Sequence, residues 1–168
     1  MTRRRFEYIV ELENFRYSTT PDSFAEGIWR TLTTVDQQLL AGLMLDSYRG
    51  TIDYDGETIE DAMREVNSYF SDTDSGWFDY SWLAFMEKDL ACASLVGFWP
   101  DRNSPMIAYV MTASQHKGKH LATMGVSRSL RSLAEKNYTT VHAVITEGNV
   151  PSERVFTRVG FRRFVTTK

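Results

Sequence analysis

Residues 106–130 constrain the fold more than any other stretch, because they read as a strand, a short loop and a helix in direct succession. Residues 106–113 form an apolar run of strand length, rich in residues that suit a pleated sheet. From Leu121 onward, apolar residues recur at helical spacing, at Ala122, Val126, Leu130 and Leu133. A buried strand followed closely by an amphipathic helix is therefore predicted.

The loop between them, residues 114–120, reads SQHKGKH. Gly118 can adopt backbone angles that are closed to other residues. The first N–H groups of the following helix lack partners inside that helix, and the helix dipole makes this end positive, so a phosphate would suit it. Two lysines and two titratable histidines add positive charge. An ordinary solvent-facing loop remains the alternative, since a lone glycine loop does not decide between the two.

The rest of the chain predicts strands and helices within a single domain, residues 1–168. Residues 14–28 are expected to be irregular, and residues 81–99 form a hairpin. The expected strands are residues 6–12, 81–86, 90–99, 106–113, 139–145 and 161–166, and the expected helices begin near Thr34, Thr58, Leu121 and Asn149. This order predicts an α/β fold of the α+β type, with a mostly antiparallel mixed sheet of about six to seven strands and about four flanking helices.

Capping signals and apolar spacing define the expected helices. Thr34 and Gln37 have capping-box spacing, and Asn149 is expected to be the N-cap of a helix that ends at Gly160. The expected buried faces are Val35, Leu39, Leu40, Leu43 and Met44 on the first helix, Ile59, Met63, Val66 and Phe70 on the second, and Val155, Phe156 and Val159 on the last.

Charge and cysteine content exclude several classes of protein. The formal net charge of -3 shows no general nucleic-acid footprint. The single cysteine, Cys92, forms no internal disulfide, which favours a reducing compartment. Glu7, Glu11 and Glu13 interrupt the residues that follow the N-terminal arginines, so no secretory leader is expected. No run is long enough to span a bilayer. A cytoplasmic protein that acts on neither membranes nor nucleic acid is predicted.

The loop carries a family resemblance. Gln115-x-x-Gly118-x-His120 resembles the Gln/Arg-x-x-Gly-x-Gly/Ala acetyl-CoA motif of the GNAT superfamily of acyltransferases, and it lies between a strand and a helix as in that family. Residues 149–161 follow the pattern N-x-x-S-x-x-x-F-x-x-x-G-F, which resembles a second motif of the same family. Two motifs at compatible spacing are more specific than either alone, and the resemblance extends over essentially the whole chain.

The resemblance implies acetyl-CoA as co-substrate, with no metal. In this family the pantetheine arm lies along the central strand, the pyrophosphate lies on loop amides, and an Asn contacts the arm where the sheet splays. The implied coenzyme-binding residues are Val110, Met111 and Thr112 on the strand; Gln115, His116, Lys117, Gly118, Lys119, His120, Leu121 and Ala122 in the loop and helix start; and Asn149 and Phe156 downstream.

Two positions depart from the family pattern. His120 stands where the family has Gly or Ala, so its side chain either crowds the pyrophosphate, is tolerated, or contacts phosphate. Phe156 stands where many relatives have a Tyr that protonates the departing thiolate. Leaving-group protonation would then come from water, from the acceptor or from another group, or catalysis would be weak. Tyr109 and Tyr138 qualify by residue type alone, and packing residues are the alternative for both.

The implied reaction is direct attack of an acceptor amine on the thioester in a ternary complex. Glu147 is the predicted general base, with an exposed loop glutamate as the alternative. The acidic segment between residues 46 and 61 favours a cationic acceptor, either a small molecule or a protein amino group, although a solvated polar face has the same composition. A non-catalytic acyl-CoA-binding module and a plain interaction domain remain alternatives, and a homodimer stays open.

Overall fold

Residues 2–16 and 27–165 are described by the computed structural model, in which one seven-stranded sheet has the order β2-β3-β4-β5-β6-β1-β7. The strands are β1 (Arg5–Glu11), β2 (Ile28–Thr31), β3 (Trp82–Met86), β4 (Asp89–Trp99), β5 (Ser104–Thr112), β6 (Thr140–Thr146) and β7 (Arg162–Arg163). The α-helices are α1 (Gln37–Tyr48), α2 (Ile59–Asp72), α3 (Leu121–Glu135) and α4 (Val150–Arg158). The predicted fold class is confirmed, because every strand pair is antiparallel except β5–β6.

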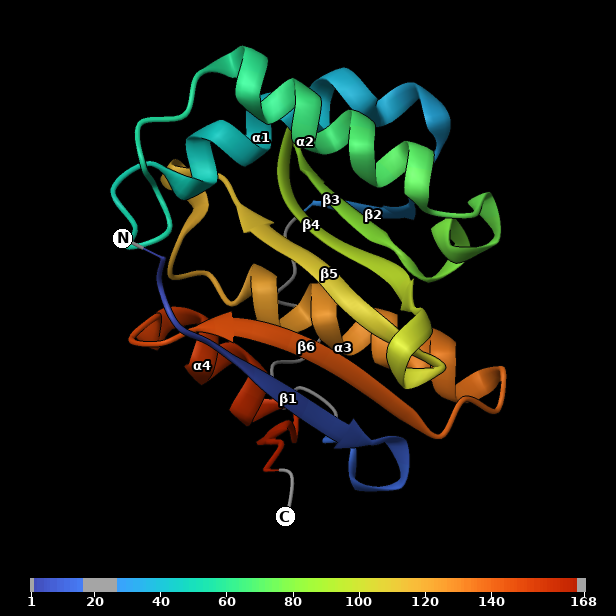
Figure 1. The fold of residues 1–168 in the computed structure, drawn as a ribbon. Coiled ribbons are helices and arrows are strands. Elements are labelled where there is room, and N and C mark those ends of the chain that lie inside the picture. The colour runs from blue at the N-terminus through green and yellow to red at the C-terminus, as the bar shows by residue number, and fades with distance from the viewer. Residues whose placement is uncertain (1, 17–26, 166–168) are drawn as a thin grey trace.

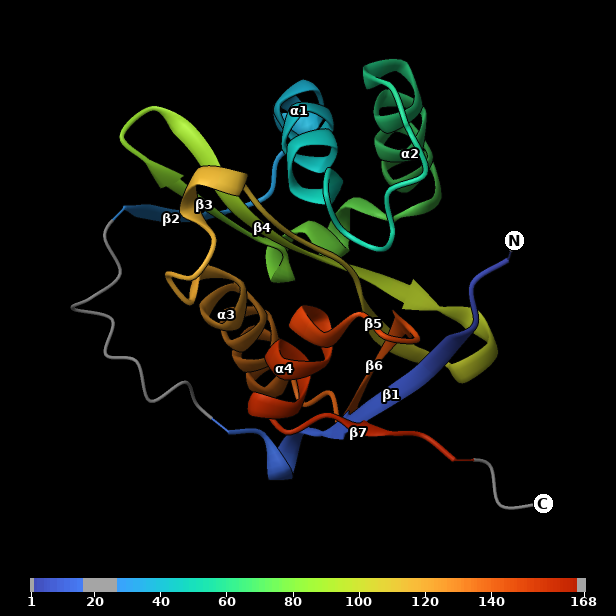
Figure 2. The same cartoon turned by 90° about the vertical axis from the view of Figure 1, so that its left-hand side faces the viewer.

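The helices cover the two faces of the sheet in pairs. α1 and α2 lie together on one face, and α3 and α4 lie on the other (Figures 1 and 2). No helix in the described ranges combines the length and the apolar content that a bilayer crossing demands.

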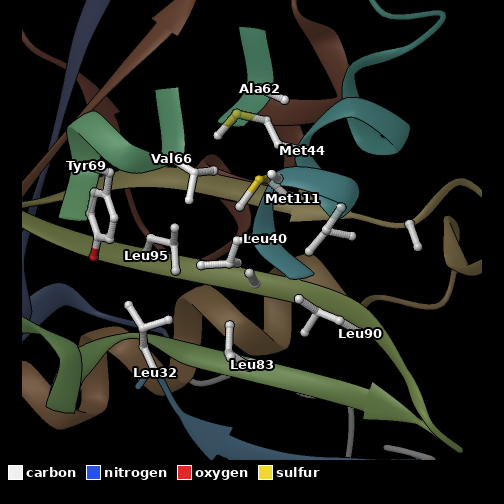
Figure 3. Packing of buried hydrophobic residues seen from close by; sticks show 14 of the residues in the cluster. Leu32, Leu40, Met44, Ala62, Val66, Tyr69, Leu83, Leu90, Leu95 and Met111 are labelled. Atoms are coloured by element: carbon white, nitrogen blue, oxygen red, sulfur yellow. The ribbon is translucent and has the colours of Figure 1, made fainter. Parts of the chain in front are cut away.

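The face beneath α1 and α2 carries the larger apolar cluster. Leu40 of α1 and Val66 of α2 pack against Leu83, Leu95 and Met111 of the sheet (Figure 3). Burial of each such side chain stabilises the fold by about 1.5–3 kcal/mol relative to an exposed one. Met111, only 1% exposed, belongs to this core, so its side chain is unavailable to a ligand.

The opposite face is covered by α3, which packs mainly against β3, β4 and β5, and by α4. Val126, Leu130 and Leu133 of α3 are fully buried in an apolar cluster on this face, and Phe156 and Val159 of α4 belong to the same cluster. Gly160 then ends the helix with φ +107°, and a Cβ there would stand 2.9 Å from the Asn14 carbonyl oxygen. This close approach leaves no space for a side chain, which explains why a glycine stands at the predicted end of the helix.

Two irregularities open the sheet at its centre. β5 and β6 pair only at Met106–His142 and Ile107–Ala143, so their carboxyl ends separate beyond these pairs. In the β4–β5 ladder Tyr109 lies opposite Leu95 and Ile107 lies opposite Val96, which leaves Ala108 as a bulge. A bulge bends its strand and strengthens the local twist. The bulge therefore lies where β5 leaves β6.

The start of α1 differs from the prediction. The capping box is formed by Thr33 and Asp36 instead of Thr34 and Gln37, and a short 3₁₀ turn (Thr34–Asp36) precedes the α-helix. Asp36 is 1% exposed, and both of its oxygens accept hydrogen bonds from the Arg30 guanidinium, at 2.6 and 2.8 Å. A buried carboxylate needs such a partner, and this tertiary pairing fixed the helix start.

The predicted helix faces are partly wrong. Val35 and Leu39 are 82% and 51% exposed, because the 3₁₀ turn changes the angular position of the first residues. Ile59 begins α2 and is also exposed. The buried stripes are Leu40, Ala41, Leu43 and Met44 on α1, with Ala62, Val66 and Tyr69 on α2.

The two edges of the sheet were also predicted incompletely. β2 follows the expected irregular segment and was missed, since its four residues show no apolar alternation. Residues 17–26 lie outside the described part. β7 covers only two residues of the predicted strand 161–166, because Phe161 is drawn into the core; Thr166 lies outside the described residues. An edge strand has a partner on one side only, which makes its pattern weak.

Candidate active site

A cavity of about 1080 Å³ lies where β5 and β6 separate. Its floor includes Tyr109 and Val110 of β5 and Val144 and Thr146 of β6. The end of α1, the loop that follows it and one side of α2 also line the cavity, together with Phe156 of α4 and Asn149 at the N-cap of that helix. The volume suits a ligand of drug size or larger. The cavity therefore joins both helix layers at the open centre of the sheet.

The edge of β5 that faces this opening presents free main-chain groups. The Ala113 N–H donates to the Ala91 carbonyl at 2.8 Å, so this residue faces β4. Because successive residues of a strand alternate, Met111 also directs its main chain to β4, whereas Val110 and Thr112 face the open edge. Of the three strand residues predicted to hold the coenzyme, Val110 and Thr112 thus have main-chain groups available, and Met111 does not.

The loop after β5 leads into the start of α3. Gly118 has φ +82°, with open space where a Cβ would be. Among the described residues, the N–H groups from Gly118 to Thr123 meet no acceptor, and the first one that does is Met124, which donates to the His120 carbonyl at 3.0 Å. Consecutive free N–H groups at a helix N-terminus favour an anion. The loop predicted to bind phosphate has the required geometry.

This loop is attached to the carboxyl end of α1. Asp46 accepts hydrogen bonds from the Ser114 backbone N–H at 2.7 Å and from its hydroxyl at 2.9 Å. The Lys117 ammonium donates to the Ser47 carbonyl at 2.9 Å, where a cation also suits the negative end of the helix dipole. Lys117 therefore holds the loop in place rather than pointing at an anion, and Lys119 lies 3.3 Å from His116 Nδ1.

His120 occupies a left-handed conformation with φ +62°, in the position just before α3. That backbone geometry favours glycine, so His120 is held in a conformation that residues with a side chain rarely adopt. The His120 side chain accepts a hydrogen bond through Nδ1 from Arg158 of α4 at 3.0 Å. The imidazole is thus engaged by α4, next to the loop amides.

Asn149 and Phe156 hold the α4 side of the cavity. The Asn149 side-chain oxygen accepts from the Ser152 N–H at 3.2 Å, which confirms the predicted N-cap. Its amide donates to Asp53 at 2.7 Å and so ties α4 to the loop between α1 and α2. Phe156 is 6% exposed and meets the Phe161 ring edge-on at 5.0 Å.

A carboxylate and two phenols meet on the α2 side. The Tyr109 hydroxyl donates a hydrogen bond to Glu65, and Tyr48 lies within electrostatic reach of both. Burial, followed by the negative charges of Asp53 and Glu65, raises the pKa of Tyr48 to about 12. Burial and the bond to Glu65 likewise raise the pKa of Tyr109. Both phenols are therefore neutral near pH 7, and the hydrogen bond from the Tyr109 hydroxyl orients the Glu65 side chain.

Glu147 is exposed in the turn between β6 and α4 and is absent from the cavity lining. Glu65 and Arg5 line the cavity, yet neither was singled out from the sequence. A signal for Glu65 existed: Asp61, Glu65, Ser68 and Asp72 recur at helical spacing and all line the cavity. Arg5 had no such signal.

Residues 30–162 match a family model described as an acetyltransferase (GNAT) domain. No curated protein matches the chain.

Solved structures share the fold at low identity. A GCN5-related N-acetyltransferase from Sphaerobacter thermophilus is 12% identical over 96% of this chain and 49% of its own, with a TM-score of 0.68. A GNAT-family acetyltransferase from Colwellia psychrerythraea is 10% identical over 96% and 53%, with a TM-score of 0.64. The present chain thus spans about half the length of these two proteins. Diaminobutyrate acetyltransferase from Paenibacillus lautus, in complex with L-2,4-diaminobutyric acid and coenzyme A, is 20% identical over 79% and 73%, with a TM-score of 0.58.

Proposed function

This chain belongs to the GNAT family of acetyltransferases, and we propose that it moves an acetyl group from acetyl-CoA to a primary amine of a small molecule or a protein. The observation that carries the proposal is the open edge of β5. That edge leads from a large cavity, past Val110 and Thr112, to the unpaired amides at the start of α3. One extended ligand with an acyl end and a phosphate end fits this path.

The coenzyme would bind mainly through main-chain groups. The pantetheine amides would pair with Val110 and Thr112 as an added strand, and the pyrophosphate would lie on the amides from Gly118 to Ala122. Asn149 is held by its cap and by Asp53, so it would shape the passage more than change its own hydrogen bonds. Phe156 would contact the arm as an apolar wall.

Catalysis would depend first on placement. Holding the amine in line with the thioester inside one cavity can supply about 7–11 kcal/mol of barrier reduction in the most favourable systems. Main-chain N–H groups of the open edge, near the Ala108 bulge, would stabilise the developing oxyanion.

The proton balance requires one acceptor and one donor. An acceptor ammonium first loses a proton to a carboxylate, and its nitrogen then forms a bond to the carbonyl carbon. The carbon–sulfur bond breaks, and the second proton of the nitrogen passes to the thiolate, directly or through water. We assign the first step to Glu65, which lies in the cavity and is oriented by Tyr109. Glu147 remains the alternative general base, and mutation of each carboxylate will distinguish the two assignments.

Phe156 gives a specific reason to keep a second candidate, a non-catalytic acyl-CoA-binding module, because its side chain has no proton to donate. If the attacking nitrogen passes its second proton to the thiolate, the reaction does not need a tyrosine at position 156. The neutral Tyr48 hydroxyl also lines the cavity.

Two measurements test the proposal together. Isothermal titration calorimetry with acetyl-CoA should give saturable binding, and a thiol-release assay with a panel of amines and peptide N-termini should show acceptor-dependent CoA production. Binding without acceptor-dependent release would favour the binding module, and no binding at millimolar acetyl-CoA would remove both candidates. The reducing compartment, the cytoplasmic location and a homodimer stay predictions.

A further inference from the structure

Two opposite charges line the acceptor side of the cavity without pairing. Arg5, at the start of β1, and Glu65, on α2, both line it. Within the described part of the chain, Glu65 is bonded to the Tyr109 hydroxyl, and Arg5 has no ion-pair partner. The only other arginine of the lining, Arg64, is paired with Asp61. Among the described residues, Arg5 is thus the arginine of this lining that has no ion-pair partner.

The neighbours of Arg5 show that its position is distinctive. Arg3 forms an ion pair with Asp55 at 3.3 Å, and the Arg4 guanidinium lies over the Phe6 ring at 4.8 Å. Arg5 pairs in register with Thr146 at the end of β6, and Thr146 itself lines the cavity. The three successive arginines therefore have three different environments, and only Arg5 belongs to the cavity.

Arg5 and Glu65 both influence the pKa values of the same two phenols, those of Tyr48 and Tyr109. Burial dominates the raised pKa values of Tyr48 and Tyr109, Glu65 raises both further, and Arg5 lowers both. The cation and the carboxylate therefore lie within electrostatic reach of the same two partly buried phenols. Opposite charges that line one cavity without forming an ion pair with each other make a dipolar site.

Resting on the proposed function, we propose that the acceptor is a small amine that also carries a carboxylate, with Arg5 binding the carboxylate and Glu65 binding the ammonium. A guanidinium presents a planar fork that holds a carboxylate through two hydrogen bonds. The ammonium then lies at the carboxylate that takes its proton, beside the bulge of β5. One group of the acceptor provides orientation and the other provides the nucleophile.

The same charges disfavour the other acceptors. A linear polyamine would place a second ammonium near the Arg5 guanidinium, and like charges repel there. A protein N-terminus brings no carboxylate at a fixed distance from its amine. These two classes serve as the contrasting arms of the test.

Matched acceptor pairs that differ only by the carboxylate provide the experiment: lysine against cadaverine, and ornithine against putrescine. In the thiol-release assay with the full chain, kcat/KM should be about 10- to 100-fold higher for the amino acid of each pair, the worth of a charge-assisted hydrogen-bonded contact. Arg5→Gln should remove that preference, because kcat/KM for the amino acid of each pair should fall to about the value for its diamine. Arg5→Lys keeps the positive charge but lacks the planar guanidinium, so it should retain part of the preference for the amino acid.

Arg4→Gln is the matched control, since it removes the adjacent arginine outside the cavity and should keep the wild-type preference. Equal or better use of the diamines by the wild type would overturn the inference, as would acetylation of peptide N-termini only, and both leave the proposed function intact. A preference that survives in Arg5→Gln with unchanged circular dichroism would overturn the role of Arg5. Failure to release thiol with every acceptor, together with no acetyl-CoA binding, would refute the proposed function itself.

Discussion

The two ends of the cavity are constructed from different parts of the polypeptide. At the α3 end, the groups offered to a ligand are main-chain N–H and C=O groups of two consecutive segments, the open edge of β5 and the loop that follows it. At the α2 end, the groups are side chains from β1, α1, α2 and β5, including Arg5, Tyr48, Glu65 and Tyr109. A main-chain site tolerates many side chains but demands backbone geometry, whereas a side-chain site can change its specificity with a single substitution. We therefore expect the coenzyme to be the constant part of the reaction and the acceptor the variable part.

The strongest test of the main-chain end is Gly118→Asp. The new carboxylate would stand among the unpaired amides and repel the pyrophosphate, so the affinity for acetyl-CoA should fall about 1000-fold, or about 4 kcal/mol. Isothermal titration calorimetry measures the loss.

Two controls separate charge from backbone strain. Gly118→Ala has space for its Cβ but keeps φ +82°, so it should weaken binding far less than Asp. Gly50, which lies outside the loop, has a similar φ of +75° and the same open space around it, so Gly50→Asp should bind acetyl-CoA with wild-type affinity. Wild-type affinity of Gly118→Asp would mean that the loop does not hold the phosphates.

The side-chain end is tested by Glu65→Gln against Glu147→Gln. Loss of a general base costs about 100-fold or more in rate, so kcat should drop by that amount in Glu65→Gln while the affinity for acetyl-CoA stays the same. Glu147→Gln should behave as the wild type. Steady-state kinetics of both variants decides between the two carboxylates, and the reverse result would assign the base to the exposed turn.

Phe156→Tyr tests whether the α4 wall limits the reaction. A hydroxyl added to this cavity-lining ring would offer a proton to the departing thiolate, and kcat should rise about three- to tenfold if that step is limiting. Pre-steady-state thiol release reports the step directly. An unchanged rate would indicate that the nitrogen already supplies the proton fast enough.

The smallest effect is expected for His120→Gly. Glycine adopts the left-handed conformation at position 120 without strain, so the free energy of unfolding should rise by about 1 kcal/mol. Loss of the hydrogen bond from Arg158 to the imidazole reduces this gain, and thermal unfolding measures the net change. The affinity for acetyl-CoA should change less than about threefold, because main-chain amides carry the binding. A loss of tenfold or more would make the imidazole a direct phosphate ligand and weaken the contrast between the two ends.

Prediction from sequence succeeded where the signal was local. The strand–loop–helix around Gly118, the cap at Asn149 and the hairpin of β3 and β4 all depend on neighbouring residues, and the structure has them as predicted. The start of α1 was predicted wrongly because Arg30 captures Asp36 across a turn. The roles of single residues in the site stay predictions that the variants above will test.

By itself the sequence determined the alternation of strands and helices, the layer structure and the loop that suits a phosphate, because hydrophobic period, capping and glycine geometry act within one or two turns of chain. Only the tertiary structure decided which charged side chains line the same cavity. Arg5 and Glu65 stand 60 residues apart in the printed numbering, and the sheet order that places β1 beside β6 brings one to the cavity from the floor and the other from α2. Electrostatic partners depend on distance in space, and in this fold that distance is set by the packing of the whole core.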